Sequence, residues 1–374
     1  MKVPLVFMGT PEFAVPSLQR LVVDGYDISA VYTQPDRPAG RGRRLTPPPV
    51  KVAALGLGLA VRQPPNLRSQ EAVAELAALK PEVIVVCAFG QILRPPVLDI
   101  PPRGVINVHP SLLPRWRGAS PIAAAILAGD DVTGVTTMLM DPGMDTGPIL
   151  GQRSLSIEDR DSAASLGERL ARLAADLLSE TLPQLFEGNL TPQPQDGGQA
   201  TYCPVLRKEE GAIDWGLQAV DIWRRVRALN PWPGTFTHYR GEVLHIWEAW
   251  PLSEEPEGLQ ARAGRTSGEA ESQGGVTFGE PRERPVPGTV SALTQSQEER
   301  LLGALARATG TAGPGMGPVV GAKGLAPLLQ AFGVQTGEGV LAVLQVQRAG
   351  RRAITAAEFL RGERGLLGTV LGRP

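Results

Sequence analysis

The stretch Gly104-Val-Ile-Asn-Val-His-Pro-Ser-Leu-Leu-Pro-Arg-Trp-Arg-Gly118 joins a β-branched apolar run to two polar side chains. The run predicts a strand at about 104–109. Residues two apart in a strand project from the same face, so Asn107 and His109 should lie side by side near the end of this strand. Open α/β sheets bind their ligands outside the carboxyl ends of the strands. If the strand belongs to an open α/β sheet, the stretch therefore predicts the edge of the sheet that holds the site.

Similar apolar runs alternate with helix-period segments through the first half of the chain, which is the pattern of a Rossmann-like, mostly parallel sheet. Helices should lie between the strands. One should begin at Ser120-Pro121, where serine can cap and proline suits the first turn, and another should span about 162–187. The other predicted strands are 2–8, 28–33, 82–87, 134–140 and 148–154.

The segment 189–205 is rich in Pro, Gly and Gln and predicts an extended linker between two domains, 1–188 and 206–374. The second domain should be smaller and mostly β, with a helix at 217–229 and strands at 235–239 and 242–247. Two stretches, near 252–286 and 293–330, lack a sustained apolar period, so we expect surface insertions there.

Composition limits the chemistry. The net charge is −1, so any nucleic-acid surface must be local. Two cysteines, Cys87 and Cys203, and three histidines in 374 residues show no metal-ligand spacing, and we expect no metal. No apolar run approaches the roughly 18 residues of a membrane span, and the apolar start is too short for a signal peptide. We expect a cytoplasmic protein.

A carboxylate completes the predicted site. Asp145 lies in Asp141-Pro-Gly-Met-Asp-Thr-Gly147, a loop after another sheet strand. A carboxamide and an imidazole can donate hydrogen bonds to the oxyanion of an acyl transfer, and a carboxylate can orient the imidazole or relay a proton. Each residue also has a structural interpretation: His109 as a satisfied side chain, Asn107 as a turn cap, and Asp145 bonded to its own backbone.

Several separated segments of the chain resemble the methionyl-tRNA formyltransferase family over almost its whole length. They are Gly9-Thr-Pro-Glu-Phe13, Thr33-Gln-Pro-Asp-Arg-Pro-Ala-Gly-Arg-Gly42, Asn107-Val-His109 with Ser111-Leu-Leu-Pro-Arg-Trp-Arg-Gly118, Asp145-Thr-Gly147, Ile213-Asp-Trp215 and Asn230-Pro-Trp-Pro233. The resemblance implies a Rossmann-like formyltransferase domain followed by an OB-like β-barrel. It also implies formyl transfer from 10-formyltetrahydrofolate to the amino group of methionyl initiator tRNA.

The resemblance assigns roles to particular positions. Asn107, His109 and Asp145 match the catalytic residues of the family. The positions that match its folate-contacting loop are Ser111, Leu112, Leu113 and Pro114. A rigid strand-to-helix connection explains the same prolines. Gly9-Thr10 is not GxGxxG, so no dinucleotide is implied.

Arginines mark the expected tRNA contacts. The segment 36–44 carries four of them among Gly and Pro with nothing apolar to anchor it, as in a loop that orders on a polyanion. By resemblance this loop meets the tRNA acceptor stem, and Arg41 matches the arginine most closely tied to that role. A solvated charged surface remains the alternative for all of these contacts. The residues are Arg37, Arg41, Arg43, Arg44, Arg207, Lys208, Arg224 and Arg227.

Other functions remain open at this point. Phosphoribosylglycinamide formyltransferases share the Asn, His and Asp chemistry but lack the second domain and the basic loop. Sugar-nucleotide formyltransferases resemble the first half and carry a related second domain. An aspartic protease, suggested by Asp145-Thr-Gly147, would need a mostly β chain. A non-catalytic tRNA-binding relative is the alternative outside enzymes. We expect a monomer.

Overall fold

The computed structural model describes residues 3–39, 44–252, 286–308 and 331–372. The chain divides into two compact units, Met1–Leu206 and Arg207–Pro374. The segment 189–205, predicted as a linker, lies within the first unit.

The first unit is built on a 7-stranded sheet in the order β10-β9-β7-β6-β1-β2-β5. The strands from β7 to β5 run parallel, whereas β9 is antiparallel to both β7 and β10. The predicted strands are confirmed, and the two-residue strand β5 was not foreseen. The bounds are β1 Pro4–Gly9, β2 Asp27–Tyr32, β5 Val61–Arg62, β6 Val83–Cys87, β7 Val105–His109, β9 Val132–Leu139 and β10 Ile149–Ser156.

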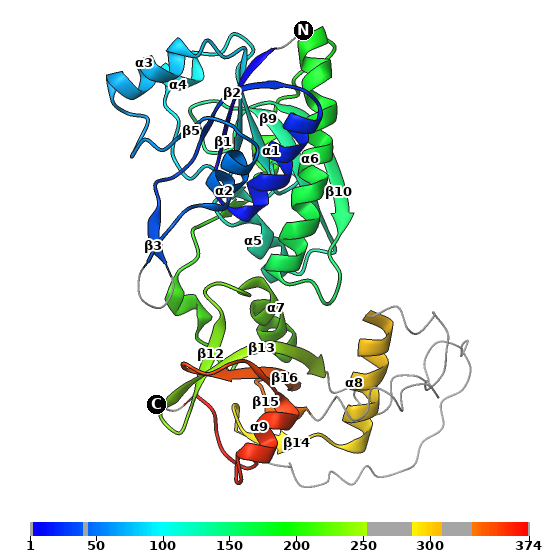
Figure 1. The fold of residues 1–374 in the computed structure, drawn as a ribbon. Helices are drawn as coiled ribbons and strands as arrows, with labels where there is room; N and C mark the ends of the chain where they lie inside the picture. The colour runs from blue at the N-terminus through cyan, green and yellow to red at the C-terminus, as the bar shows by residue number, and fades with distance from the viewer. Residues whose placement is uncertain (1–2, 40–43, 253–285, 309–330, 373–374) are drawn as a thin grey trace, which may run out of the picture. The chain divides into compact units, whose positions relative to one another are not determined.

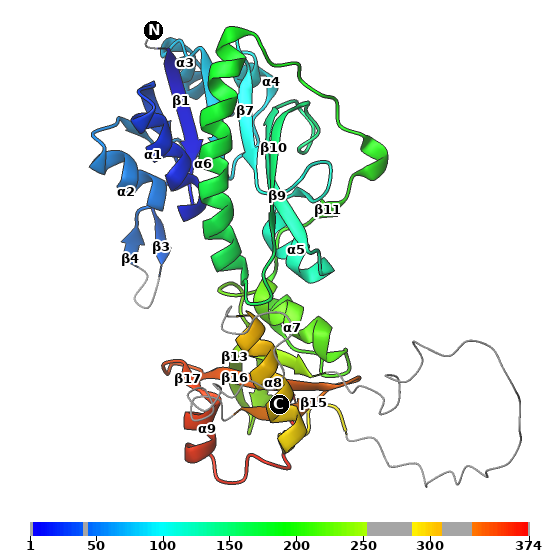
Figure 2. The same cartoon turned by 90° about the vertical axis from the view of Figure 1, so that its right-hand side faces the viewer.

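Helices cover both faces of this sheet (Figures 1 and 2). Helices α1 (Val15–Val23), α2 (Pro49–Gly56) and α6 (Ala163–Glu187) lie on one face, and α3 (Gln70–Ala78) and α4 (Pro95–Leu98) lie on the other. Alternate residues of the central strands point to opposite faces, so Val6 and Met8 pack under α3 and α4. Five of the strands are buried along most of their length, as expected of a sheet covered on both sides.

The two predicted helix starts have different chemistry. Helix α6 begins after Ser162 with a capping box, in which Ser162 and Ser165 each bond the other's backbone N–H. Helix α5 (Pro121–Ala128) begins where expected, but Ser120 makes no capping hydrogen bond through its side chain. Proline at the first position, which needs no N–H partner, therefore contributes more to this start than the serine does.

The second unit is a 6-stranded antiparallel sheet in the order β12-β13-β16-β15-β14, with β17 paired to β16. Helices α7 (Ala219–Ala228) and α9 (Ala356–Gly362) pack on a core that includes Ile222, Val226, Ile246 and Phe359. The strands are β12 Thr235–Tyr239, β13 Glu242–Leu252, β14 Val290–Ala292, β15 Phe332–Gln335, β16 Val340–Arg348 and β17 Ile354–Thr355.

One part of the predicted insertions is regular structure. Within 293–330, residues Gln295–Ala308 form helix α8, which the sequence did not predict. Leu301 and Leu305, one helical turn apart, are buried against Leu252 and Val340. These two leucines hold the helix on the sheet, but a single pair of apolar residues gives only a weak periodic signal in the sequence. Residues 253–285 and 309–330 lie outside the described residues.

Candidate active site

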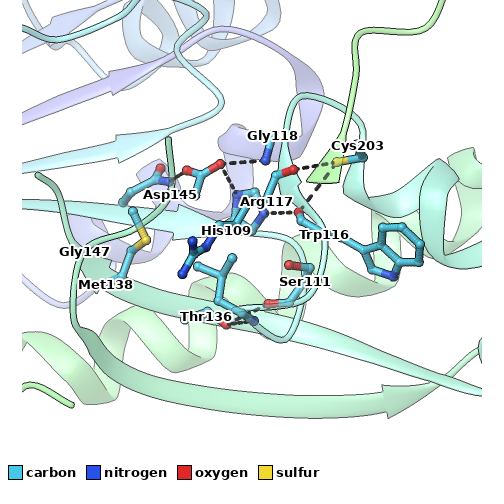
Figure 3. Close-up of polar contacts among 12 residues, drawn as sticks. His109, Ser111, Trp116, Arg117, Gly118, Thr136, Met138, Asp145, Gly147 and Cys203 are labelled. Carbon is cyan, nitrogen blue, oxygen red and sulfur yellow. Dashed lines mark hydrogen bonds and ion pairs between the residues drawn. The ribbon is translucent and has the colours of Figure 1, made fainter. Parts of the chain in front are cut away.

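The three predicted catalytic side chains meet beside the sheet. Figure 3 shows His109 and Asp145 facing each other. Asn107 Nδ2 donates a 3.3 Å hydrogen bond to Asp145 Oδ1. His109 Nδ1 lies 3.7 Å from Asp145 Oδ2. Asn107 and His109 are adjacent on the same face of β7, as the period-two argument predicted, and Asp145 reaches them from the loop after β9. The side chain of His109 is 5% exposed and that of Asp145 16% exposed, so water screens their interaction poorly.

Asp145 is also held by backbone. The N–H of Gly118 donates to Asp145 Oδ2 over 2.9 Å. Asp145 itself has φ +53°, in the left-handed region that a non-glycine residue enters at a cost. Two residues on, a Cβ on Gly147 would lie 1.8 Å from the carbonyl oxygen of Leu139, so only glycine fits where the loop rejoins the sheet. The loop therefore has one tightly specified path.

The orientation of the His109 ring is fixed from its other side. His109 Nε2 lies 2.9 Å from the carbonyl oxygen of Trp116. Because a carbonyl only accepts, Nε2 carries the hydrogen in this arrangement, and Nδ1 is the nitrogen that faces Asp145. The two ring nitrogens thus both face oxygen atoms, which suits an imidazole that gains a proton during the reaction.

Trp116 is itself braced by charged and polar neighbours. Its indole N–H donates to Asp130 Oδ2 over 2.8 Å, and Arg115 makes a two-pronged ion pair with the same carboxylate. Asp130 raises the pKa of the Arg115 guanidinium, which stacks 4.4 Å above the Trp116 ring. The backbone N–H of Trp116 donates to Thr201 Oγ1 over 2.8 Å. These bonds hold the carbonyl that orients His109.

A short parallel ladder fastens this loop to the segment predicted as a linker. Strand β8 (Arg117–Gly118) pairs with β11 (Tyr202–Cys203). Cys203 is buried, its Sγ donates to the carbonyl oxygens of Trp116 and Arg117, and burial raises the pKa of its thiol. Gly118 has φ +115°, and a Cβ there would lie 2.3 Å from the Cys203 carbonyl oxygen. The close approach of the two backbones accounts for this glycine.

The predicted folate loop, Ser111 to Pro114, is tied down by polar contacts. Ser111 Oγ donates to the Arg115 carbonyl over 2.6 Å, and the Leu113 N–H donates to Thr136 Oγ1 over 3.1 Å. Ser111 and Leu113 are buried, whereas Leu112 and Pro114 are half-buried. The loop is therefore the rigid strand-to-helix connection that its prolines suggested. Of these four side chains, only those of Leu112 and Pro114 offer surface to a ligand.

The arginines predicted to contact tRNA are dispersed. Arg37 and Arg44 are exposed on a two-stranded hairpin of β3 (Arg37–Ala39) and β4 (Arg44–Thr46), and Arg37 donates to Gln34 Oε1. Arg41 and Arg43 lie outside the described residues. In the second unit Arg207 and Lys208 are exposed.

The two arginines of α7 have local partners. Arg224 forms an ion pair with Asp221 at 3.4 Å, and Arg227 lies 4.3 Å above the Trp223 ring. In the same helix, Val226 is buried and Trp223 packs against the core. Arg227 thus lies over an aromatic ring, whereas Arg224 lies beside a carboxylate.

Comparison with known proteins follows the same two-part division. The model of the formyl transferase family matches residues 1–182, and the model of the formyl transferase C-terminal domain matches residues 205–302. A methionyl-tRNA formyltransferase of Solibacter usitatus is 41% identical over 360 residues, which is 96% of both chains. One of Chloroflexus aurantiacus is 53% identical over 245 residues, covering 66% of this chain and 79% of the relative. The chain belongs to the methionyl-tRNA formyltransferase family.

Solved structures share the fold at lower identity. HypX from Aquifex aeolicus, crystallised with tetrahydrofolic acid, aligns with a TM-score of 0.56 at 15% identity, over 96% of this chain and 47% of that chain. An N-formyltransferase from Helicobacter canadensis, in complex with folinic acid and dTDP-3-aminofucose, aligns with a TM-score of 0.57 at 15% identity, over 92% and 99%. Both show the formyltransferase fold, and the α/β sheet excludes the aspartic protease considered above.

The described residues also bear on metal binding and on membrane insertion. No group of three or more His, Cys, Asp and Glu side chains among them is arranged to hold a metal ion. In the same parts of the chain, no helix combines the length and apolar character needed to cross a bilayer.

Proposed function

We propose that this protein transfers a formyl group from 10-formyltetrahydrofolate to the amino group of methionyl initiator tRNA. The observation that carries the proposal is the contact of Asp145 with both Asn107 and His109, in a chain of the methionyl-tRNA formyltransferase family. A carboxamide, an imidazole and a carboxylate around one point suit a reaction that passes through a tetrahedral oxyanion and moves a proton.

Asn107 and His109 stabilise the oxyanion that forms when the amine attacks the formyl carbon. Asn107 Nδ2 carries two hydrogens, and donating one to Asp145 leaves one for the formyl oxygen. His109 donates from Nδ1 when its ring carries a second proton, because Nε2 already donates to the Trp116 carbonyl. Removing one such donor typically lowers the rate about a hundredfold to a thousandfold.

Asp145 manages the proton. Attack requires a neutral amine within about 3 to 3.5 Å of the formyl carbon, and the attacking nitrogen then sheds a proton. The Asp145 carboxylate accepts it directly, or through His109 or a water, and returns a proton to folate N10 as that nitrogen leaves. A positioned acid or base of this kind contributes about 10² to 10⁴ in rate.

The folate donor approaches the exposed side of the loop after β7. Leu112 and Pro114 offer half-buried apolar surface, and the hydrogen bonds of Ser111 and Leu113 keep that surface in place. Pre-organisation of this kind lowers the entropy cost of binding. The folate contacts thus come from two side chains and the backbone of the loop, with Ser111 and Leu113 as its supports.

The tRNA is held by positive charge on both units. Arg37 and Arg44, with Arg41 and Arg43 between them in sequence, meet the acceptor stem, while Arg207, Lys208, Arg224 and Arg227 contact backbone phosphates. We take the antiparallel sheet of the second unit to be an OB-like barrel, a fold that combines positive grooves with aromatic surfaces. The tRNA contacts of the second unit add affinity, whereas formyl transfer takes place in the first unit.

A direct assay tests the proposal. Purified protein and 10-formyltetrahydrofolate are incubated with initiator Met-tRNA, uncharged tRNA, glycinamide ribonucleotide or an amino-sugar nucleotide, and N-formyl product is measured. The proposal expects product from Met-tRNA alone. Product from a small amine, or tRNA binding with no transfer to any amine, would contradict it and support the corresponding alternative.

A further inference from the structure

Gln195 lies in the proline-rich segment after α6, and its side chain joins two loops of the candidate active site. Its Nε2 donates to the carbonyl oxygen of Asp145 over 2.8 Å and to that of Gly147 over 2.7 Å. Its Oε1 accepts from Arg117 Nη2 over 2.8 Å and from Arg117 Nε over 3.1 Å. One carboxamide thus makes two hydrogen bonds to loop carbonyls and two to Arg117, and its Nε2 also lies 3.9 Å from Met138 Sδ.

The chemistry of these neighbours permits one orientation of the amide. Both groups on one side are carbonyl oxygens, which only accept, and the group on the other side is a guanidinium, which only donates. Turning the amide over would place Oε1 against two carbonyl oxygens and Nε2 against Arg117. Glutamine fits here because it carries a double donor and an acceptor on one short, flat group. Glutamate would lose the donors, and methionine would lose both functions.

The Asp145 loop needs such a support. The backbone of Asp145 is in the left-handed conformation. Its carboxylate must at the same time contact Asn107, His109 and the N–H of Gly118. Gln195 bonds the carbonyl of Asp145 itself and that of Gly147 two residues later. A pair of bonds two residues apart fixes the direction in which the intervening backbone turns.

The guanidinium of Arg117 provides the second anchor. Arg117 is 5% exposed, and it donates to neutral partners, Gln195 and the Tyr202 hydroxyl. It stands between Trp116, whose carbonyl orients His109, and Gly118, whose N–H bonds Asp145. A buried guanidinium must be hydrogen-bonded, so the two bonds from Arg117 anchor the Gln195 amide on the side away from the Asp145 loop.

We infer that Gln195 is a positioning residue for formyl transfer: it acts through Asp145, by fixing the Asp145 loop to the loop that orients His109. This inference rests on the proposed function for its effect on rate. Its effect on the geometry of Asp145 does not depend on the acceptor. The role belongs to a segment whose composition predicted only a linker.

The test compares three variants. Gln195→Met keeps the length of the side chain without its hydrogen bonds. Gln195→Glu keeps the shape and the contact with Arg117 but turns an oxygen toward the two loop carbonyls. Gln193→Ala is the control, because Gln193 is exposed, pairs with Ile149 through backbone alone and uses its side chain only for the Thr191 carbonyl among the described contacts.

Two kinds of measurement are made on each full-length variant. The first is the first-order rate constant of formyl transfer in a single turnover with enzyme in excess, which does not depend on the fraction of folded enzyme, together with the Kd for tRNA. The second is the hydrogen-exchange protection of the Gly118 amide by NMR, which reports the bond to Asp145 whether or not the protein transfers a formyl group.

We expect Gln195→Met and Gln195→Glu each to lower the rate constant about tenfold to a hundredfold and to reduce protection of the Gly118 amide, with Kd unchanged. Gln193→Ala should match the wild type. A wild-type rate constant in Gln195→Glu, or full Gly118 protection in either Gln195 variant, would overturn the inference. A wild-type protein that formylates nothing, with Gly118 protection still lost in the variants, would remove the proposed function and keep the role of Gln195.

Discussion

The backbone N–H of Gly118 donates a 2.9 Å hydrogen bond to the carboxylate of Asp145, which joins the loop after β7 to the loop after β9. Through this bond the backbone itself helps to place the carboxylate against His109. The same oxygen, Oδ2, lies 3.7 Å from the His109 ring, so a shift of the Gly118 backbone changes the environment of both groups.

Gly118→Ala should therefore damage catalysis. The added Cβ would meet the Cys203 carbonyl at 2.3 Å, and φ +115° disfavours any side chain, so the backbone must move. We expect kcat to fall about tenfold to a hundredfold, because misplacing a catalytic group by about 1 Å can cost a factor of 10². Gly188→Ala is the matched control: φ is +74°, but nothing lies near its Cβ position. Equal kcat in the two variants would contradict the role of Gly118.

Arg41→Ala should weaken the productive tRNA complex and leave folate binding unchanged. A residue that contacts one phosphate releases about one counterion on binding. Its loss should therefore make the negative slope of log K for tRNA binding against log salt concentration shallower by about 0.9. Equilibrium binding of initiator tRNA across a salt series measures both effects. A variant with a normal tRNA slope and a defect as deep as that of His109→Ala would contradict the division of labour proposed here.

His245 should make the second unit sensitive to acid. Burial lowers its pKa, Lys208 lowers it further, and a hydrogen bond with the Thr235 backbone opposes them. Because the folded pKa lies below the ordinary value of about 6.5, the unfolded chain binds more protons between the two values. The stabilising contribution of neutral His245 to the free energy of unfolding is therefore fully present above about pH 6.5. It is lost as the pH falls from there toward the pKa of His245 in the folded protein.

Chemical denaturation of wild type and His245→Gln from pH 7.5 to 5 measures this effect. Comparing the two proteins at each pH cancels the titration of the other groups. The unfolding free energy of the wild type should fall more steeply than that of the variant below about pH 6.5. Parallel pH profiles would show that His245 does not titrate differently on folding.

Both thiols should be inert in the folded protein. Burial raises the pKa of Cys87 to about 12 and also raises that of Cys203, and the thiolate is the reactive form. We expect labelling by a small alkylating reagent at pH 8 to be slow for both residues and to become fast in denaturant. Mass spectrometry of time points assigns the rates. Fast labelling of Cys203 in the native state would mean that the β8–β11 ladder opens readily.

The sequence predicted the first unit well because its signals are local. The apolar strands follow from β-branched runs, and Asn107 and His109 share a face because the strand period is two. Asp145 was recognised from its turn composition and the family resemblance, but the sequence does not contain its left-handed backbone or the Gly118 bond. Those depend on which loops meet in space.

The features that the sequence did not predict depend on weak or long-range signals. The segment 189–205 looked like a linker because it has few apolar residues, yet Cys203 is buried and Gln195 is fully hydrogen-bonded in the first unit. A lone glutamine among prolines carries no sequence signal of that role. Helix α8 was missed because Leu301 and Leu305 stand among polar and charged residues, and their burial depends on strands distant in sequence.

The central claim is that Asn107, His109 and Asp145 act together on one formyl carbon while tRNA is held elsewhere. The most direct measurement is single-turnover formyl transfer, alongside the Kd for initiator Met-tRNA, in Asn107→Ala, His109→Ala and Asp145→Asn. The account predicts a loss of about a hundredfold or more in rate for each, with Kd unchanged. Near-normal transfer in any of the three, or a loss that appears only in Kd, would contradict it.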